Sequence, residues 1–481
     1  MLILLFLVFA ATVYLAILGD CGMLGPDEPR YSAIGRAMAE SGDWVTPRLW
    51  GEPWFEKPVL SYWLTAAGTS IGLPGEWAAR APVALLSILF LGFYAWALGR
   101  LAGTRESAAA TMMLAASAGW LAYSHVAVTD LPLAASFGAA LLAGLLRLQG
   151  SGRWALWLCG AAAGLALLAK GLVAAVLLLP LVWFARGRWK DLAVAGAAAL
   201  LVAGPWYAAV TAANGWAFID VFFIRHHFSR FASEELRHVQ PFWFYLPVIL
   251  GMIFPWTAMA PSLPKQLWKD DWAKVAGITL AFGFIFFSIS RNKLPGYILP
   301  LLPLYIALLA TSAVRYDHPG RTFGLTGILL SIVPVIGSAL PAAMLYGITR
   351  ADWGGLPWQY VAAALPVGSA AWFLARQGRV VASIAVLSVV MLTSALWVKL
   401  GAWPVLDEVV SAKGLYRKVK TRQSDACIES LHRSMRYGLN YYTRTPIPDC
   451  AEHPRPVRII QETGGMPSLR VEVSPAERQS P

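Results

Sequence analysis

The sequence has few charged residues, which excludes most soluble globular proteins. Asp, Glu, Lys and Arg make up 14% of its 481 residues, whereas soluble domains average about 25%. Hydrophobic residues make up 57%, and the mean hydropathy is +0.56. A composition of this kind is typical of a chain embedded in a lipid bilayer.

Motifs that bind nucleotides and zinc are also missing. The sequence contains no GxxxxGK[ST] loop, no GxGxxG segment after a strand and no DxD motif for nucleotide sugars. Of its four cysteines, Cys21 and Cys159 are isolated, whereas Cys427 and Cys450 lie in a polar C-terminal segment. The last two would form a disulfide if that segment lies outside the cytoplasm, and two separate thiols are the equal alternative.

The first residues lack the pattern of a cleaved signal peptide. No basic region precedes the apolar run MLILLFLVFAATVYLAIL and no small-residue cleavage site follows it, so we expect a retained first helix. The chain has 39 Lys and Arg against 27 Asp and Glu, a net charge of +12. In a membrane protein this excess is expected to face the cytoplasm or anionic lipid headgroups rather than a nucleic acid.

Long apolar runs predict an all-α polytopic membrane protein. A helix needs about 20 apolar residues to cross the hydrocarbon core. Thirteen stretches fit this length loosely, with one long run divided at Lys170: 1–19, 81–99, 107–123, 131–146, 154–169, 171–185, 191–213, 241–261, 275–289, 296–314, 322–346, 358–375 and 380–402. We therefore predict a transmembrane domain over residues 1–403 and a small C-terminal domain over residues 404–481.

The distribution of basic residues predicts the orientation, because cytoplasmic loops are enriched in Lys and Arg. With the N-terminus inside, most basic residues of the short turns are cytoplasmic: Arg100, Arg105, Arg147, Arg153, Arg186, Arg188, Lys190, Lys265, Lys269, Lys274, Arg315, Arg321, Arg376 and Arg379. The long loops 20–80 and 211–240 and the C-terminal segment are then outside. An activated donor on that side is expected to be carried by lipid, since nucleotides would not reach it.

Aromatic and charged side chains alternate in the first long loop. The aromatic residues are Trp44, Trp50, Trp54, Phe55, Tyr62 and Trp63, and Arg48, Glu52, Glu56 and Lys57 lie between them. Segments of this kind lie in the plane of the lipid headgroups rather than crossing the membrane. We therefore expect interfacial helices here, beside a site for a substrate with an apolar tail and a polar head.

Acidic residues at the outer helix ends are the candidates for catalysis. Asp27 and Glu28 follow the first helix in GPDEPRY, and carboxylates there can orient or deprotonate an acceptor hydroxyl. A cap for the next helix is an equal alternative for them, and Asp130 in VTDLP also fits an N-cap. Because charges near a membrane interior are costly and tend to mark function, we predict catalytic roles for Asp27, Glu28 and Asp130.

Basic residues on the same side are candidates for holding a phosphate. Lys57 follows Glu56, and its compact charge suits a phosphate oxygen, although a lysine extended toward the membrane surface is the alternative for Lys57 and Lys170. Lys293 and Tyr297 interrupt the apolar pattern in SRNKLPGY, where an aromatic-belt tyrosine is the alternative. The segment IRHHFSRF of the second long loop can bind phosphate, or a divalent cation through one His together with Glu56.

Several segments, in order from about residue 25 to 305, resemble the aminoarabinose transferase and protein O-mannosyltransferase superfamily of C-type membrane glycosyltransferases. They are GPDEPRYSAIGRAMAESGDWVTPRLWGEPWFEKPVLSYW, VAVTDLPLA, LLAKGLVAAVLLLP, HHFSRF, QPFWFYLP and FFSISRNKLPGYILPLLP, and the later YGLNYYTRTPIPDC resembles the aminoarabinose branch. The resemblance implies about thirteen transmembrane helices and a small α/β periplasmic C-terminal domain. It also implies a bacterial inner-membrane location, a site facing the periplasm and no required cofactor.

The resemblance also implies roles for particular residues. Asp27 and Asp130 match the acidic positions of the first two outer loops. The group expected around the donor phosphate consists of Lys57, Arg230, Tyr297, Arg30 and Lys170, with Lys293 added from the outer cluster. Glu56 and His227 match positions that approach each other, with a divalent cation between them as one option. His226 stands where related sequences often have Glu, which leaves the ligating His open.

The implied activity is transfer of a sugar from undecaprenyl phosphate to lipid A or a related glycolipid by one inverting displacement. The phosphate-binding residues would stabilise charge on the leaving phosphate. Asp27 would orient or deprotonate the acceptor, and Asp130 would place the sugar or stabilise the cationic ring. If the acceptor is itself a phosphate, no base is needed and Asp27 only positions it.

Other functions remain open at this point. Within the same class, the acceptor would be a protein hydroxyl or a cell-wall glycan. A transporter or flippase for lipid-linked sugars often shows internal repeats and polar groups near the bilayer midplane, whereas here no repeat is evident and the polar groups gather at one side. A non-catalytic membrane anchor for the C-terminal domain leaves the charged cluster unexplained.

Overall fold

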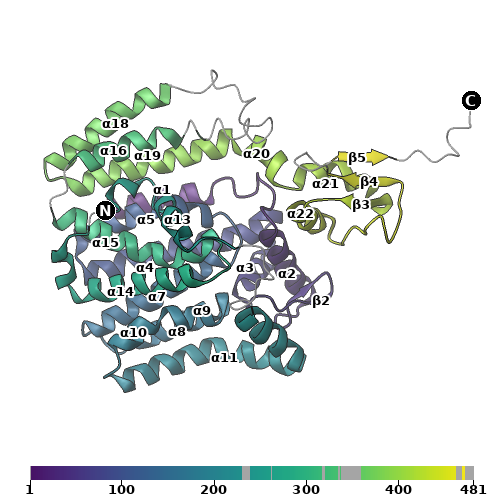
Figure 1. Ribbon diagram of the computed structural model, residues 1–481, viewed down its shortest axis with the longest axis horizontal. Coiled ribbons are helices and arrows are strands. Elements are labelled where there is room, and N and C mark those ends of the chain that lie inside the picture. Colours follow the sequence, from purple (N-terminus) through teal and green to yellow (C-terminus); the bar gives the residue numbers. More distant parts are fainter. Residues whose placement is uncertain are drawn as a thin grey trace, which may run out of the picture.

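The computed structural model describes residues 2–229, 239–261, 263–316, 320–333, 336, 359–461 and 468–471. Most of them form helices that run roughly side by side in one bundle, and a small mixed unit projects from one end of it (Figure 1). The predicted fold class, an all-α membrane protein with a small α/β C-terminal unit, is confirmed.

Six helical segments of the described residues are long and apolar enough to cross a bilayer. They are α4 (Gly75–Leu101), α7 (Asp130–Leu148), α11 (Trp189–Ile219) extended to Ile224, α14 (Asp271–Ile289), η5 with α15 (Pro295–Arg315) and α19 (Val380–Gly401). Other apolar helices are shorter, among them α1 (Leu2–Leu15) and α8 (Trp154–Lys170). The number of thirteen crossings therefore stays a prediction.

Some of the predicted apolar runs divide into shorter helices. These are α5 (Thr104–Ala115) and α6 (Ala118–Tyr123), α9 (Leu172–Leu177) and α10 (Leu179–Phe184), and η2 (Phe242–Phe244), α13 (Tyr245–Met252) and η3 (Trp256–Met259). Pro180 lies in the first turn of α10 and Pro255 directly precedes η3. Proline has no amide proton and clashes with the preceding turn, so a helix tends to end or begin there.

The remaining bundle elements are η1 (Asp220–Ser229), η4 (Lys265–Lys269), η5 (Pro295–Leu301), α15 (Leu302–Arg315), α16 (Gly320–Leu330) and α18 (Gln359–Arg376).

The two most enclosed membrane helices are α7 and the segment formed by η5 and α15. In each, 83% of the apolar window is buried, against 22% in the segment that contains α11. Asp130 begins α7 and Tyr297 lies in the first turn of η5. Both side chains are therefore held at the ends of tightly packed elements, which restricts their movement.

The first long loop folds into two helices and a short hairpin at one end of the bundle (Figure 1). Helix α2 (Asp27–Ser41) starts after Pro26 and ends where Gly42 adopts the left-handed conformation, with φ 73°. The hairpin pairs β1 (Arg48–Leu49) with β2 (Glu52–Pro53), and α3 (Leu60–Ser70) follows. Asp27, Arg30, Glu56 and Lys57 thus come from one compact segment.

The C-terminal unit has its own hydrophobic core, which includes Leu415, Ile428 and Leu439. After α20 (Trp403–Val410) it comprises α21 (Lys413–Val419), η7 (Lys420–Asp425), β3 (Ala426–Ser430), α22 (Arg433–Thr443), β4 (Val457–Ile460) and β5 (Ser468–Val471). The sheet order is β3-β4-β5, with β3 parallel and β5 antiparallel to β4. Cys427 and Cys450 form a disulfide, which decides between the two alternatives that the sequence leaves open.

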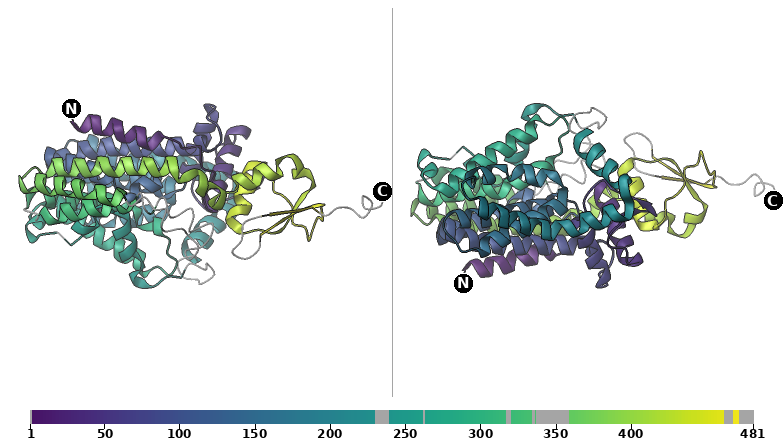
Figure 2. Two further views of the ribbon diagram at one scale, coloured as in Figure 1. Left: turned by 90° about the horizontal axis from the view of Figure 1, so that it is seen from above. Right: turned by 90° about the horizontal axis from the view of Figure 1, so that it is seen from below.

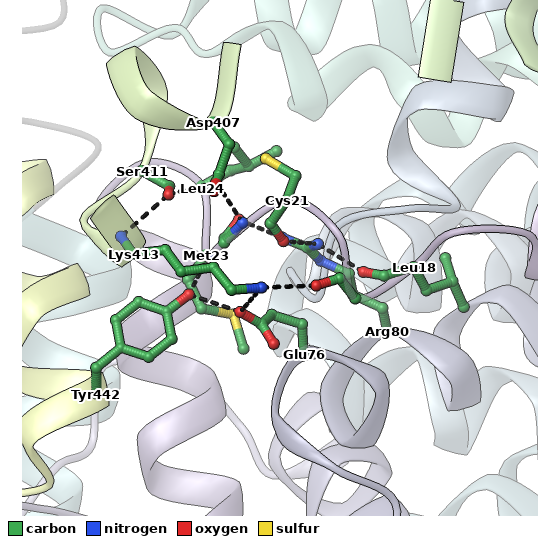
Figure 3. Close-up of polar contacts among 12 residues, drawn as sticks. Leu18, Cys21, Met23, Leu24, Glu76, Arg80, Asp407, Ser411, Lys413 and Tyr442 are labelled. Carbon is green, nitrogen blue, oxygen red and sulfur yellow. Dashed lines mark hydrogen bonds and ion pairs between the residues drawn. The ribbon is translucent and has the colours of Figure 1, made fainter. Parts of the chain in front are cut away.

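A polar network joins the C-terminal unit to the chain just before α2 (Figure 3). The Asp407 carboxylate accepts a hydrogen bond of 2.6 Å from the Gly22 amide. The Tyr442 hydroxyl accepts from the Met23 amide at 3.0 Å and donates to Glu76 at 2.8 Å. Lys413 forms an ion pair of 3.2 Å with the same Glu76 carboxylate. The unit is therefore docked against the loop that carries Asp27, at the bundle end seen in two further views in Figure 2.

Candidate active site

A cavity of about 630 Å³ opens at the end of the bundle where the first long loop and the C-terminal unit meet. Its lining residues come from segments far apart in the sequence: Pro26, Asp27, Arg30, Tyr31, Pro53, Trp54, Phe55, Glu56, Lys57, Thr129, Asp130, Lys170, Val221, Leu294, Tyr297 and Arg433. Seven of the predicted site residues are among them, namely Asp27, Arg30, Glu56, Lys57, Asp130, Lys170 and Tyr297. The cavity combines aromatic walls with charges of both signs, which suits an amphipathic substrate.

Asp27, Arg30, Glu56 and Lys57 form one charged cluster on one side of the cavity. The Arg30 guanidinium forms ion pairs with Asp27 and, at 3.0 Å, with Glu56. The Lys57 ammonium lies 3.5 Å from the other Glu56 oxygen, which is longer than a good charge-assisted hydrogen bond. The contact between Lys57 and Glu56 is therefore an ion pair without a short hydrogen bond.

Arg30 is the fixed centre of this cluster. Its side chain is only 3% exposed, and its guanidinium lies over the rings of Trp54 and Tyr437 at 5.6 and 5.0 Å. Burial acts to lower the pKa of Arg30, but the carboxylates of Glu56 and Asp27 raise it above its ordinary value. Arg30 thus stays charged and orients Asp27, whose side chain is 40% exposed and accessible from the cavity.

Asp130, Lys170 and Tyr297 form a second cluster. The Lys170 ammonium, at the last residue of α8, donates to the Asp130 carboxylate at 2.6 Å and lies 4.3 Å from the centre of the Tyr297 ring. Gly296 allows this approach, because an added Cβ would lie 2.7 Å from both the Asp130 carboxyl carbon and the Tyr123 hydroxyl. Such distances are too short for non-bonded atoms, so a side chain at position 296 would displace Asp130 or Tyr123.

Glu28 does not line the cavity, although it is adjacent to Asp27. Its side chain is fully buried and forms an ion pair with Arg80 through two contacts of 2.8 Å. The carboxylate also accepts from the amides of Leu24, at 2.6 Å, and Ala127, at 2.9 Å. Successive helical residues point in different directions, which explains the difference. In place of the predicted catalytic role, the position of Glu28 indicates a structural one.

Arg80 extends this buried network to the loop before α2. Its guanidinium donates to the carbonyl oxygens of Leu18, Cys21 and Gly22 at 2.7 to 2.8 Å (Figure 3). The loop therefore accepts hydrogen bonds from Arg80 on one side and donates hydrogen bonds to Asp407 and Tyr442 on the other. Nothing in the sequence singles out Arg80, which lies near the start of a largely apolar helix.

Lys293 also lies outside the cavity lining. Its ammonium donates to the backbone carbonyl oxygens of Gln240, at 3.0 Å, and Ser290. Burial lowers the pKa of Lys293. These contacts give it a role in fixing the loop between α14 and η5, in place of the predicted contact with a donor phosphate.

Two predicted ligands fall where the structure describes no side chain. Arg230 lies outside the described residues, and so does the side chain of His227 in η1. Among the described residues, no group of three or more His, Cys, Asp or Glu is placed to hold a metal ion. A divalent cation between Glu56 and His227 therefore stays a prediction.

Arg433 and Tyr437 reach the cavity region from the C-terminal unit. Arg433 begins α22 and lines the cavity, and its guanidinium lies 5.5 Å from the centre of the Tyr437 ring. The same ring stacks on Trp50 at 5.8 Å. Sequence reasoning missed both residues, because they lie in a polar segment whose docking position has no local signal.

Comparisons with known proteins show that the chain is similar to membrane glycosyltransferases. The family profile for dolichyl-phosphate-mannose-protein mannosyltransferase matches residues 56–211. The undecaprenyl phosphate-alpha-4-amino-4-deoxy-L-arabinose arabinosyl transferase of Pseudomonas aeruginosa (strain UCBPP-PA14) is 32% identical over 91% of this chain and 86% of its own length. The transferase of the same name from Edwardsiella ictaluri is 30% identical over 68% of this chain and 62% of its own.

Solved structures show the same relationship. The crystal structure of ArnT from Cupriavidus metallidurans bound to undecaprenyl phosphate superposes with a TM-score of 0.79 at 27% identity. The match covers 96% of this chain and 93% of that one. The apo structure of the same protein gives a TM-score of 0.76.

Proposed function

Because the chain belongs to the aminoarabinose transferase family of membrane glycosyltransferases, we propose that it transfers 4-amino-4-deoxy-L-arabinose from undecaprenyl phosphate to lipid A. The family establishes a multi-pass membrane enzyme that transfers a glycosyl group. The names of the relatives and the undecaprenyl phosphate bound in the Cupriavidus structure support the choice of donor. The acceptor and a periplasmic site in the inner membrane are further parts of the proposal.

One observation carries it: a single cavity brings Asp27, Asp130, Lys57 and Tyr297 together at one end of the bundle. Lipid-linked sugars present their phosphate at the membrane surface, so a charged cavity at a bundle end is where the polar head would enter. The aromatic walls, including Trp54 and Phe55, offer an apolar surface to the first part of the lipid tail.

The donor phosphate is assigned to Lys57 and Tyr297, with Arg230 as the further predicted ligand. During transfer, the bond between the anomeric carbon and the phosphate oxygen breaks, and its electron pair leaves with the phosphate. Lys57 and the Tyr297 hydroxyl stabilise the growing negative charge on that oxygen. Asp130, held by Lys170 at 2.6 Å, faces the positive charge that develops on the sugar ring.

The acceptor oxygen forms the new bond to the anomeric carbon from the opposite face, so one displacement inverts its configuration. Asp27, held by Arg30 and accessible from the cavity, is assigned to this side. A hydroxyl acceptor would pass its proton to the Asp27 carboxylate. A phosphate acceptor is already ionised, and Asp27 would then only help to position it.

The test is transfer by the purified protein. Wild type and Asp27→Asn are incubated with undecaprenyl phosphate-linked aminoarabinose and lipid A, and products are identified by mass spectrometry. We expect one added sugar with wild type and none with the variant. Donor binding without transfer to lipid A, to protein or to cell-wall glycan would refute the proposal and favour a transporter of lipid-linked sugars.

A further inference from the structure

Arg433 is the one residue of the C-terminal unit among those that line the described cavity. We propose that Arg433 is a specificity-determining residue that binds an anionic group, such as a phosphate, on the acceptor. This inference rests on the proposed function. The C-terminal unit would then be part of the acceptor site rather than an appendage of the bundle.

The position of Arg433 is fixed by the way α22 packs on α2. The Arg36 guanidinium donates to the Tyr441 carbonyl at 2.9 Å and lies 4.4 Å from the centre of the Tyr441 ring. Together with the network around Glu76 (Figure 3), these contacts set the C-terminal unit in one orientation relative to the cavity.

The charges of the cavity leave Arg433 available to a ligand. The lining carboxylates Asp27, Glu56 and Asp130 are paired with Arg30, Lys57 and Lys170. Within the described part of the chain, Arg433 pairs with no carboxylate, and its guanidinium lies 5.5 Å from the centre of the Tyr437 ring. A guanidinium presents several planar donors that match two oxygens of one phosphate, which makes Arg the favoured residue for such groups.

An exposed arginine is usually only solvated, so its surroundings decide the interpretation. Tyr437 contacts both Arg433, at 5.5 Å, and Arg30, at 5.0 Å, and stacks on Trp50. Both guanidinium groups therefore contact the same ring at the cavity wall. Arg30 is already paired with Asp27 and Glu56, so of these two guanidinium groups Arg433 is the one that an anionic group of a ligand would bind.

The location also favours the acceptor over the donor. Through Tyr437, Arg433 adjoins Arg30, which is paired with Asp27, the residue assigned to the acceptor. Asp27 is the most exposed of the three lining carboxylates, at 40% against 13% for Glu56 and 16% for Asp130. Because Asp27 is assigned to the acceptor, we place Arg433 on the acceptor side of the cavity.

The first experiment compares Arg433→Ala and Arg433→Lys with Arg417→Ala, an exposed arginine on α21 that does not line the cavity. Initial rates are measured with each substrate varied in turn. For Arg433→Ala we expect the acceptor KM to rise about tenfold, the usual effect of a lost charge-assisted hydrogen bond. The donor KM should stay within about twofold, Arg433→Lys should be intermediate and Arg417→Ala should match wild type.

The second experiment measures binding without transfer. Lipid A, dephosphorylated lipid A and undecaprenyl phosphate are titrated separately into purified wild type and Arg433→Ala in detergent. Wild type should bind lipid A more tightly than its dephosphorylated form, and the variant should lose this preference while binding undecaprenyl phosphate unchanged. Thermal unfolding verifies that the variant is folded, and Arg433→Lys provides the same comparison if it is not.

The outcomes separate this inference from the proposed function. Transfer by wild type with equal acceptor KM values in wild type and Arg433→Ala would overturn the inference alone. A rise confined to the donor KM would assign Arg433 to the donor phosphate and also overturn it. If wild type transfers no sugar, the proposed function fails, and the binding preference for phosphorylated lipid still decides the role of Arg433.

Discussion

Asp27 and Glu28 are neighbours in the first turn of α2 and have opposite environments. The Asp27 side chain is 40% exposed and faces the cavity, whereas Glu28 is fully buried against Arg80. Each is paired with an arginine, so pairing alone does not distinguish a site residue from a structural one. The difference lies in what else each carboxylate contacts. Glu28 accepts hydrogen bonds from two backbone amides, whereas Asp27 is accessible to a substrate.

The largest effect is expected from breaking the buried pair. Arg80→Ala leaves the Glu28 carboxylate uncompensated and frees three carbonyl groups, which should destabilise the protein by about 3–5 kcal/mol. The measurement is thermal unfolding in detergent, with Arg100→Ala, an exposed arginine at the end of the same helix, as the control. Equal unfolding temperatures for Arg80→Ala and the control would show that the pair is not structural.

Asp27→Asn tests the role of the accessible carboxylate, as Arg80→Ala tests that of the buried one. Transfer should fall by at least about a hundredfold if Asp27 deprotonates the acceptor, while the unfolding temperature stays close to that of wild type. The control is Glu52→Gln, which makes the same chemical change at an exposed carboxylate of the same loop and should keep full activity. A loss of less than about tenfold would indicate that Asp27 only positions the acceptor.

Gly296→Ala tests the second cluster without removing a charge. The new methyl group overlaps the positions of Asp130 and Tyr123, so one of them must move. A displacement of about 1 Å typically costs up to a hundredfold in rate, and we expect a loss of about tenfold to a hundredfold in kcat. Gly251→Ala, where no atom lies within 4 Å of the added methyl group, is the matched control. Equal kcat values for the two variants would contradict the assigned geometry.

The smallest effect is expected from an exposed pair at the junction with the C-terminal unit. Arg444 and Glu40 are 68% and 49% exposed, and ion pairs of this kind often contribute nothing measurable. Glu40→Gln should therefore leave both the unfolding temperature and transfer unchanged. A clear loss of stability would show that the α2–α22 contact depends on this pair more than on the buried network.

The sequence predicted the membrane fold because long apolar runs and few charges leave little alternative. It also predicted every charged residue of the cavity lining except Arg433, since charges that gather at one end of a membrane bundle, such as Asp27, Lys57 and Asp130, are costly without a purpose. Glu28 and Lys293 were assigned to the site by proximity in sequence, and the directions of their side chains placed them elsewhere.

Arg80 and Arg433 could not be predicted from the sequence for a different reason. Arg80 lies within an apolar helix, where the position of its partner depends on how α2 packs. Arg433 follows a long polar segment and reaches the cavity only because α22 docks on α2. Contacts between segments so far apart in the chain leave no periodicity or spacing that a single sequence reveals.

The loop before α2 has a consequence for the order of synthesis. The Gly22 and Met23 amides find their partners in Asp407 and Tyr442, which lie 385 and 419 residues later in the chain. This loop leaves the ribosome early, but its hydrogen bonds to Asp407 and Tyr442 can form only when the chain is almost complete. The growing protein therefore inserts its helices with an unfinished site, and lipid substrates meet a competent enzyme only after the C-terminal unit has folded into place.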